Sequence, residues 1–403
     1  MPRRKEKPVK YHYSSMMDFI QPLPIAQLLN REEDPGQISF ANGFPDPATF
    51  PVEELRAAFD RAFSRYGANA LQYAPPEGLP SLREKICRQL KESGIRCELE
   101  NVLLTQGGSQ ALDLIASMFL DRGDTILCEN PTYTGAMGPF DMRDVNYIGI
   151  DVDQEGMDID QAERALAEHP EVKFIYVIPD FQNPTGATLS LSRRRRLLEL
   201  AEIYDMLIVE DSPYRELCFG EENLPSLKSM DRNGRVILLG TYSKILCPGL
   251  RLGWVVASKE IVSRMTALRI ASDMQCSSIN MYALDEYFEE ADFAAHIRGL
   301  RRLYSEKKQC ITDAMRRCFP KNVRYTDPQG GIFLWLTLPP QVDAARLLRE
   351  LVLPREHVAY LPGEGFYCRT PQKNTCRLNF SGCTIDQLET GIERLGRVFR
   401  QVL

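Results

Sequence analysis

Two basic residues seven positions apart, Lys244 and Arg251, lie between two short apolar runs, Val236–Leu239 and Gly253–Ala257. Both runs end at Gly or polar residues, which predicts two buried strands. A lysine held at such a junction loses solvent, so its pKa falls and its amine becomes a nucleophile toward an aldehyde. Arg251 is a fixed cation that suits a phosphate group. The spacing therefore predicts a site for a ligand that carries an aldehyde and a phosphate.

A second anion site is predicted at Gly107-Gly108-Ser109-Gln110, which follows the apolar run Val102–Thr105 and opens a helical pattern. Glycines allow the backbone to turn sharply, and the free N–H groups of a helix N-terminus bind anions. The hydroxyls of Thr241 and Ser243 can donate hydrogen bonds to the same phosphate.

Four polar or aromatic residues that follow predicted strands suit the ring of such a ligand. Asp211 ends the strand Leu207–Glu210, where a carboxylate can keep a pyridine nitrogen protonated. Tyr214 and Asn183 can hydrogen-bond a ring oxygen, and Tyr133 can stack on the ring. A phosphorylated pyridine aldehyde is pyridoxal phosphate.

Each motif alone also has a local explanation, such as a turn, a helix cap or a half-buried tyrosine. Their shared position after strands, in one chain order, favours a single cofactor site.

The elements that must position these residues alternate between strand and helix. Helical patterns lie at Ser109–Leu120, Ser192–Tyr204 and Lys259–Ile270. Such alternation predicts a mostly parallel sheet with helices on both faces. The run Arg193–Arg196 opens the second helix, and most of its side chains are expected to face water. The remaining predicted strands are Thr125–Cys128 and Phe174–Ile178.

The regular alternation of predicted strands and helices ends near residue 290. A long helix is predicted over Phe293–Arg317, closed by Pro320. Short elements follow, and they predict a second, α+β domain: strands at Gly331–Leu336, Val358–Leu361 and Cys376–Phe380, and a final helix at Ile385–Gln401.

Composition narrows the class of protein. The net charge of -6 over 403 residues argues against a nucleic-acid surface. No apolar run reaches the roughly 20 residues that span a bilayer. The eleven cysteines form no Cys-x-x-Cys pair, and only four histidines accompany them, so no metal site is expected. Reduced thiols in a cytoplasmic protein are the expectation.

From about residue 36 to 403 the chain resembles class I/II aminotransferases of the aspartate-aminotransferase fold, in the branch that includes 2-aminoadipate, aromatic and branched-chain aminotransferases. The same module forms the effector domain of MocR-type regulators. The resemblance implies an α/β, fold type I, pyridoxal-phosphate enzyme with a seven-stranded, mostly parallel sheet. It also implies these divisions: a flexible basic tail (1–11), a segment packing on the small domain and the active site (12–48), a large domain (49–290) and a small domain (291–403).

The resemblance also implies roles for individual residues. Lys244 would form the Schiff base and shuttle the proton, Asp211 would pair with the ring nitrogen, and Arg377 would grip the substrate carboxylate. Tyr73 matches a tyrosine that reaches a neighbouring subunit's phosphate, which implies a homodimer with shared active sites. The other matches are Asn183 and Tyr214 at the ring oxygen, Tyr133 on the ring, Gly108, Ser109, Gln110, Thr241, Ser243 and Arg251 around the phosphate, and Asn42 and Gly43 over the substrate side chain.

The predicted function is transfer of the amino group of an L-α-amino acid to a 2-oxo acid such as 2-oxoglutarate. Lyase or racemase chemistry on the same fold is the alternative, followed by a MocR-like regulator, although the residues before the module lack a helix-turn-helix pattern. Aromatic, branched-chain and dicarboxylic substrates all remain open. A dicarboxylic one needs a second contact, for which Tyr13, Ser14 and Arg31 are candidates.

Overall fold

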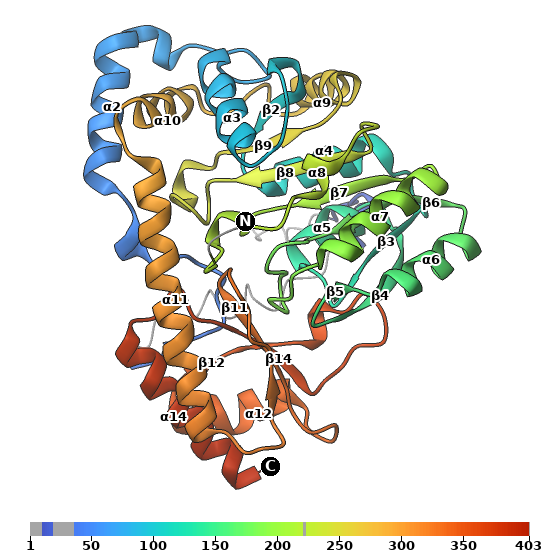
Figure 1. Ribbon diagram of the computed structural model, residues 1–403, viewed down its shortest axis with the longest axis vertical. Coiled ribbons are helices and arrows are strands. Elements are labelled where there is room, and N and C mark those ends of the chain that lie inside the picture. Colours follow the sequence, from blue (N-terminus) through green and yellow to red (C-terminus); the bar gives the residue numbers. More distant parts are fainter. Residues whose placement is uncertain (1–9, 19–35, 221–222, 403) are drawn as a thin grey trace, which may run out of the picture.

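The computed structural model describes residues 10–18, 36–220 and 223–402. Its larger sheet has the strand order β2-β9-β8-β7-β6-β3-β4-β5 (Figure 1). The strands from β8 to β4 pair in parallel, whereas β9 is antiparallel to both of its neighbours and β5 is antiparallel to β4. The strands are β2 (Val102–Thr105), β3 (Thr125–Asn130), β4 (Asn146–Asp153), β5 (Gly156–Met157), β6 (Val172–Val177), β7 (Leu207–Asp211), β8 (Val236–Thr241) and β9 (Gly253–Val256).

Helices cover both faces of this sheet. In β6, Phe174 and Tyr176 pack in one apolar cluster, with residues of α4, α5 and α9. Ile175 and Val177 pack in another, with residues of α6 and α7. The strand therefore alternates between two buried faces, as expected of a parallel sheet. The helices are α2 (Val52–Tyr66), α3 (Pro80–Glu92), α4 (Gly108–Phe119), α5 (Thr134–Asp141), α6 (Ile159–Glu168), α7 (Leu191–Ile203), α8 (Leu227–Met230), α9 (Lys259–Ser272) and α10 (Ser278–Glu290).

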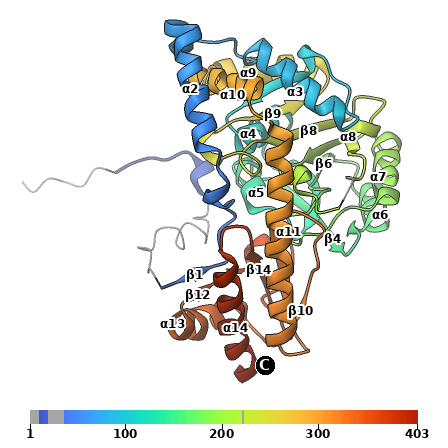
Figure 2. The same ribbon diagram turned by 60° about the vertical axis from the view of Figure 1, so that its left-hand side comes forward.

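A second, four-stranded sheet is antiparallel, with the order β10-β11-β14-β13. The long helix α11 runs from beside the large sheet to this smaller one, where it packs on α14 (Figure 2). The elements are α11 (Phe293–Cys318), β10 (Arg324–Tyr325), β11 (Phe333–Thr337), α12 (Ala344–Leu347), α13 (Leu353–Glu356), β12 (Val358–Ala359), β13 (Leu361–Pro362), β14 (Thr375–Asn379) and α14 (Ile385–Val402).

Just before α2, residues 38–40 lie along the smaller unit. Strand β1 (Ile38–Ser39) pairs in parallel with β12, and the amide of Asn379 donates to the carbonyl of Phe40. Residues 1–9 and 19–35 lie outside the described residues, and the domain limits stay a proposal.

The predicted elements are found with their ends shifted by a few residues. Three expectations need correction. The sheet has eight strands rather than seven in the described residues, because Gly156–Met157 turns back on the end of β4. The run Val358–Leu361 is divided between β12 and β13, which pair with different partners. Arg194 is 0% exposed and bonded to Asp180, because its position on α7 faces inward.

No helix in the described ranges is long and apolar enough to cross a membrane. The same residues contain no cluster of three or more His, Cys, Asp or Glu suited to hold a metal ion.

Candidate active site

Most of the predicted site residues converge at one edge of the large sheet, at the carboxyl ends of its parallel strands. Asn130 ends β3, Asp211 ends β7 and Thr241 ends β8. The smaller sheet adds Arg377 from β14. Ligands of open α/β sheets bind at this edge, so the fold itself assembles the site.

Lys244 lies in the turn between β8 and β9, and its Nζ donates to the carbonyl oxygen of Gly43 at 2.8 Å. Burial, together with the nearby positive charges of Arg377 and Arg251, lowers the pKa of Lys244 to about 8. A substantial fraction of the amine is therefore neutral and nucleophilic near pH 8, far below the usual range of a lysine.

The residues predicted to bind the phosphate lie close together. Gly107 has a φ of 77° and precedes α4, whose first residues leave their N–H groups free. A Cβ at Gly107 would come within 3.0 Å of the Arg251 guanidinium. Thr241 Oγ1 is 3.0 Å from Ser243 Oγ in the adjacent turn. A helix N-terminus, a guanidinium and two hydroxyls thus form a cradle for a dianion.

Asp211 is a buried carboxyl group, 7% exposed, with no ion pair among the described residues. Its Oδ2 accepts a hydrogen bond from the Tyr176 hydroxyl at 2.8 Å. Burial raises the pKa of Asp211 to about 6, and this hydrogen bond opposes the rise. The group is therefore largely ionised at neutral pH and suits a protonated nitrogen as its counter-ion.

Arg377 is a buried cation, as Asp211 is a buried anion. It is 3% exposed and forms no ion pair with any described residue. Its Nη1 donates to Asn183 Oδ1 at 2.9 Å and its Nη2 to the carbonyl of Ala41 at 2.9 Å. The guanidinium lies 4.1 Å from the centre of the Phe333 ring and 5.1 Å from that of Phe366. Burial lowers its pKa to about 10, so it stays charged at neutral pH. A buried, unpaired guanidinium suits a carboxylate ligand.

The residues predicted to contact the ring share one electrostatic environment. Tyr214 is buried and packs edge-to-face on Phe333, with ring centres 5.7 Å apart. Burial raises its pKa, and Asn183 opposes the rise through a side-chain hydrogen bond. Burial raises the pKa of Tyr133, the nearby charge of Asp211 also raises it, and the nearby charges of Arg377 and Arg251 oppose the rise. The structure thus brings these tyrosines together with both charged groups.

Several predicted residues lie elsewhere or make other contacts. Tyr73 is 78% exposed in the single chain, and Tyr13 is also exposed. The Gln110 side chain accepts from the Gln106 amide and donates to Asp273, so it holds the turn rather than pointing its amide at an anion. Ser14 caps Met16, and Arg31 lies outside the described residues.

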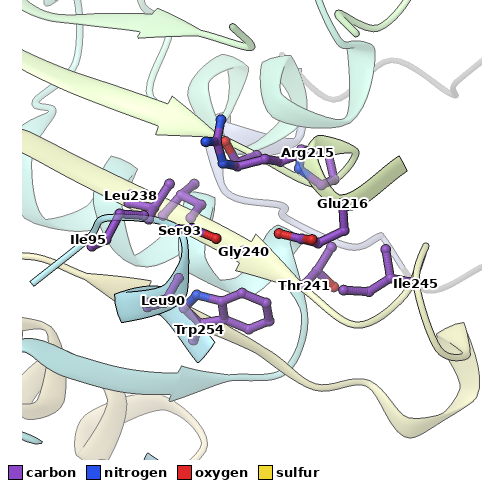
Figure 3. Close-up of a pocket in the computed structure, with 13 residues that line it drawn as sticks. Leu90, Ser93, Ile95, Arg215, Glu216, Leu238, Gly240, Thr241, Ile245 and Trp254 are labelled. Carbon is purple, nitrogen blue, oxygen red and sulfur yellow. The ribbon is translucent and has the colours of Figure 1, made fainter. Parts of the chain in front are cut away.

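A small cavity of about 40 Å³ lies behind the end of β8, between Leu90, Ile95 and Trp254 (Figure 3). Thr241 lines it, but Lys244, Asp211 and Arg377 do not. The cavity is therefore separate from these three side chains.

Sequence reasoning missed the residues that support the site. Tyr176 holds Asp211, and Glu129 and Gln182 form a buried network beside it. Their sequence context gives little indication of this role. Tyr176 lies in an apolar strand pattern like its neighbours, and Glu129 is an ordinary polar residue after a predicted strand.

Comparisons with known proteins agree with this geometry. The chain is 38% identical over 388 residues to 2-aminoadipate transaminase of Thermus thermophilus, covering 95% of each protein. It is 37% identical to aromatic-amino-acid aminotransferase 1 of Thermococcus litoralis, covering 94% of this chain and 91% of that protein. The crystal structure of Thermus thermophilus α-aminoadipate aminotransferase with N-(5'-phosphopyridoxyl)-L-leucine superposes with a TM-score of 0.89 at 37% identity, over 96% of this chain and 97% of that one.

The fold and the site define a fold type I enzyme that uses pyridoxal phosphate. A family model for aminotransferases of class I and II matches residues 35–395, and the chain belongs to that family. It is a pyridoxal-phosphate-dependent aminotransferase, and the comparisons do not favour the lyase, racemase or regulator alternatives.

The residues present fit the cofactor. The cradle of α4 and Arg251 suits its phosphate, the unpaired Asp211 suits its ring nitrogen, and the Lys244 amine suits its aldehyde.

Proposed function

We propose that Lys244, Asp211 and Arg377 carry the transamination of an L-α-amino acid in this chain, with a 2-oxo acid as the amino acceptor. One observation carries the proposal: the site holds a buried anion and a buried cation, each without an ion-pair partner among the described residues, together with an amine of lowered pKa. Unpaired buried charges are costly, so both are retained for ligands. Asp211 is left for a ring cation and Arg377 for a substrate anion.

In this mechanism each residue has a distinct task. Pyridoxal phosphate supplies an electron sink that accepts the electrons left when a proton leaves the substrate Cα. Asp211 keeps the ring nitrogen protonated, which strengthens that sink. Arg377 binds the α-carboxylate through its two Nη atoms, and Phe333 and Phe366 exclude water from the contact. Lys244 Nζ would remove the Cα proton and deliver it to the carbon atom of the former cofactor aldehyde.

The remaining contacts orient these groups. Asn183 bonds both Arg377 and Tyr214, so it links the carboxylate subsite to the ring. The Gly43 carbonyl accepts a hydrogen bond from Lys244 Nζ, which supports the proposal that the Asn42–Gly43 segment lies over the substrate. Relatives named for aromatic amino acids and for 2-aminoadipate support an L-α-amino acid with a large side chain.

Absorbance spectroscopy tests this function. The purified protein is expected to show a visible band from pyridoxal phosphate bonded to lysine. Addition of single L-amino acids should abolish the band, fastest for the true substrate, and 2-oxoglutarate should restore it. A visible band that survives the whole panel of amino acids would contradict the proposal.

We further propose a cytoplasmic homodimer in which Tyr73 of the partner subunit contacts the phosphate. Exposed Leu71, Tyr73 and Met274 support a buried interface in this region. An open hollow of about 400 Å³ beside Tyr73 and Gln275 offers room for a second chain. The scattered cysteines, all present as free thiols, support a reducing compartment.

Subunit complementation checks the shared site. Lys244→Ala and Tyr73→Ala are each expected to be nearly inactive alone. In an equal mixture after dissociation and reassociation, each hybrid dimer has one site with an intact lysine and tyrosine, so activity should recover to about a quarter of wild type. If the mixture shows only the average of the two variants, Tyr73 does not serve the neighbouring site.

A further inference from the structure

Two turns carry side chains that face the ring, and one buried network joins them. The first turn follows β3, and Tyr133 lies two residues beyond its Pro131. The second follows β6 and contains Asn183, which bonds Arg377 at 2.9 Å. The strands β3 and β6 pair in parallel, so both turns leave the same edge of the sheet side by side.

The Gln182 amide uses its full hydrogen-bonding capacity between these turns. Its Nε2 donates to the Pro131 carbonyl at 2.8 Å and to Glu129 Oε2 at 3.3 Å. Its Oε1 accepts from the backbone amide of Thr185 at 2.9 Å and from the Thr185 hydroxyl at 2.6 Å. Two donors and two acceptors saturate a primary amide, which fixes its orientation.

Glu129 anchors this amide to the sheet. The residue is 1% exposed, and its Oε2 also accepts from the backbone amide of Ile178 at 3.0 Å, just beyond β6. One carboxyl oxygen therefore ties the end of β3, the end of β6 and the Gln182 side chain together. A buried network in which one oxygen accepts from two groups and the Gln182 amide is saturated restricts the geometry of both turns.

We propose that Glu129 and Gln182 form a clamp that holds the turns of Tyr133 and Asn183 in a fixed relation, and that both are positioning residues for the transamination. The inference rests on the roles proposed for Tyr133 and Asn183. Glu129 and Gln182 act only through those two side chains and, through Asn183, on Arg377.

Glu129 is largely neutral at neutral pH, which agrees with a positioning role rather than a role as a counter-ion. Burial, opposed by the hydrogen bonds from Ile178 and Gln182 and helped by the negative charge of Asp211, raises its pKa to about 8. The other titratable groups that face it are Tyr176 on β6 and the Cys128 thiol, whose pKa values are both raised. At neutral pH Glu129 is therefore largely protonated, and Asp211 carries the single negative charge of this pair.

Two variants of Glu129 test the clamp. Glu129→Gln is a neutral isostere that keeps a side-chain oxygen acceptor, whereas Glu129→Ala removes both carboxyl oxygens. Glu210→Ala is the matched control, because Glu210 is also fully buried at the end of a neighbouring strand and accepts two backbone N–H groups, those of Leu227 and Lys228. The holoenzymes are diluted, and the rate of cofactor loss is measured from the decrease of the visible absorbance band. The rate of the half-reaction is measured with one amino acid.

Glu129→Gln is expected to stay within a few-fold of wild type in both rates. Glu129→Ala should lose cofactor and slow the half-reaction by about 10- to 100-fold, because a displacement near 1 Å has this effect. Glu210→Ala should lower the thermal midpoint without this change in rate. If Glu129→Ala does not fold, Gln182→Met removes the same bridge and should show the same rates.

A third readout uses the cofactor-free protein. Between the unfolded pKa near 4.5 and the folded value of about 8, the native state binds more protons at Glu129 than the unfolded state does. Its contribution to stability is thus present below pH 4.5 and is lost as pH rises toward 8. The difference in melting temperature between Glu129→Gln and wild type should grow in favour of the variant from pH 5 to 8.

Equal effects of Glu129→Ala and Glu210→Ala on cofactor loss and on the half-reaction would overturn the clamp. This result, obtained with a wild type that loads the cofactor and transaminates, would leave the proposed function intact. A wild type that forms no visible band would instead overturn the roles on which the clamp rests.

Discussion

Lys244→Ala is expected to lower transamination by at least about 10⁴-fold, since it removes both the nucleophile for the cofactor aldehyde and the group that moves the Cα proton. The amine is poised for both tasks, because burial and the charges of Arg377 and Arg251 bring its pKa to about 8. The measurement is single-turnover loss of the visible band with the best amino acid, together with steady-state turnover. The variant should bind the cofactor without forming that band.

The exposed Lys259, paired with Glu98 and Glu100, supplies the control, and Lys259→Ala should retain wild-type turnover. Near-normal transamination by Lys244→Ala would refute the assignment of Lys244 to these tasks.

The pH dependence of stability gives an independent check in the cofactor-free protein. Between pH 8 and the unfolded value of 10.5 the unfolded state binds more protons, so the contribution of Lys244 to stability is lost as pH falls through that range. Lys244→Met should abolish this part of the slope.

Arg377→Met is expected to lower kcat/KM for the amino acid by about 10²- to 10³-fold, because a buried two-pronged contact to a carboxylate is worth several kcal/mol. The same change should leave the melting temperature of the cofactor-free protein unchanged or higher. Arg377 is buried without an ion-pair partner among the described residues, and such a charge destabilises the fold until its ligand arrives. Kinetics of the half-reaction and thermal unfolding check the two effects together.

Arg377→Lys provides the matched comparison, and it should recover little activity. A lysine keeps the charge but loses the planar fork and its contact with the rings of Phe333 and Phe366. If Arg377→Met lowered kcat/KM no more than a change of the exposed Arg346, the carboxylate subsite would lie elsewhere.

Local patterns were sufficient for much of the fold. The apolar runs of β2, β7, β8 and β9 are short and end at Gly or polar residues, so strand and boundary signals coincide. The strand β4 was not predicted, because several of its side chains are partly or fully exposed and it has no continuous apolar run. Most of the run Arg193–Arg196 was expected to face water, and the pattern did not reveal that Arg194 is buried, because its partner Asp180 is distant from it in the sequence.

Amino-acid sequence alone was sufficient to predict the candidate reacting groups, because Lys244, Asp211, Asn183 and Arg251 each follow a strand and the carboxyl ends of parallel strands meet at one edge. Only the tertiary structure decided what those groups experience. Arg377 lies 133 residues beyond Lys244, yet its charge lowers the pKa of the amine, and Gly43, 201 residues before Lys244, holds the amine nitrogen. The lowered pKa, the two unpaired charges and the bridge from Glu129 to Gln182 arise from burial and long-range contacts, and no local spacing encodes either of these.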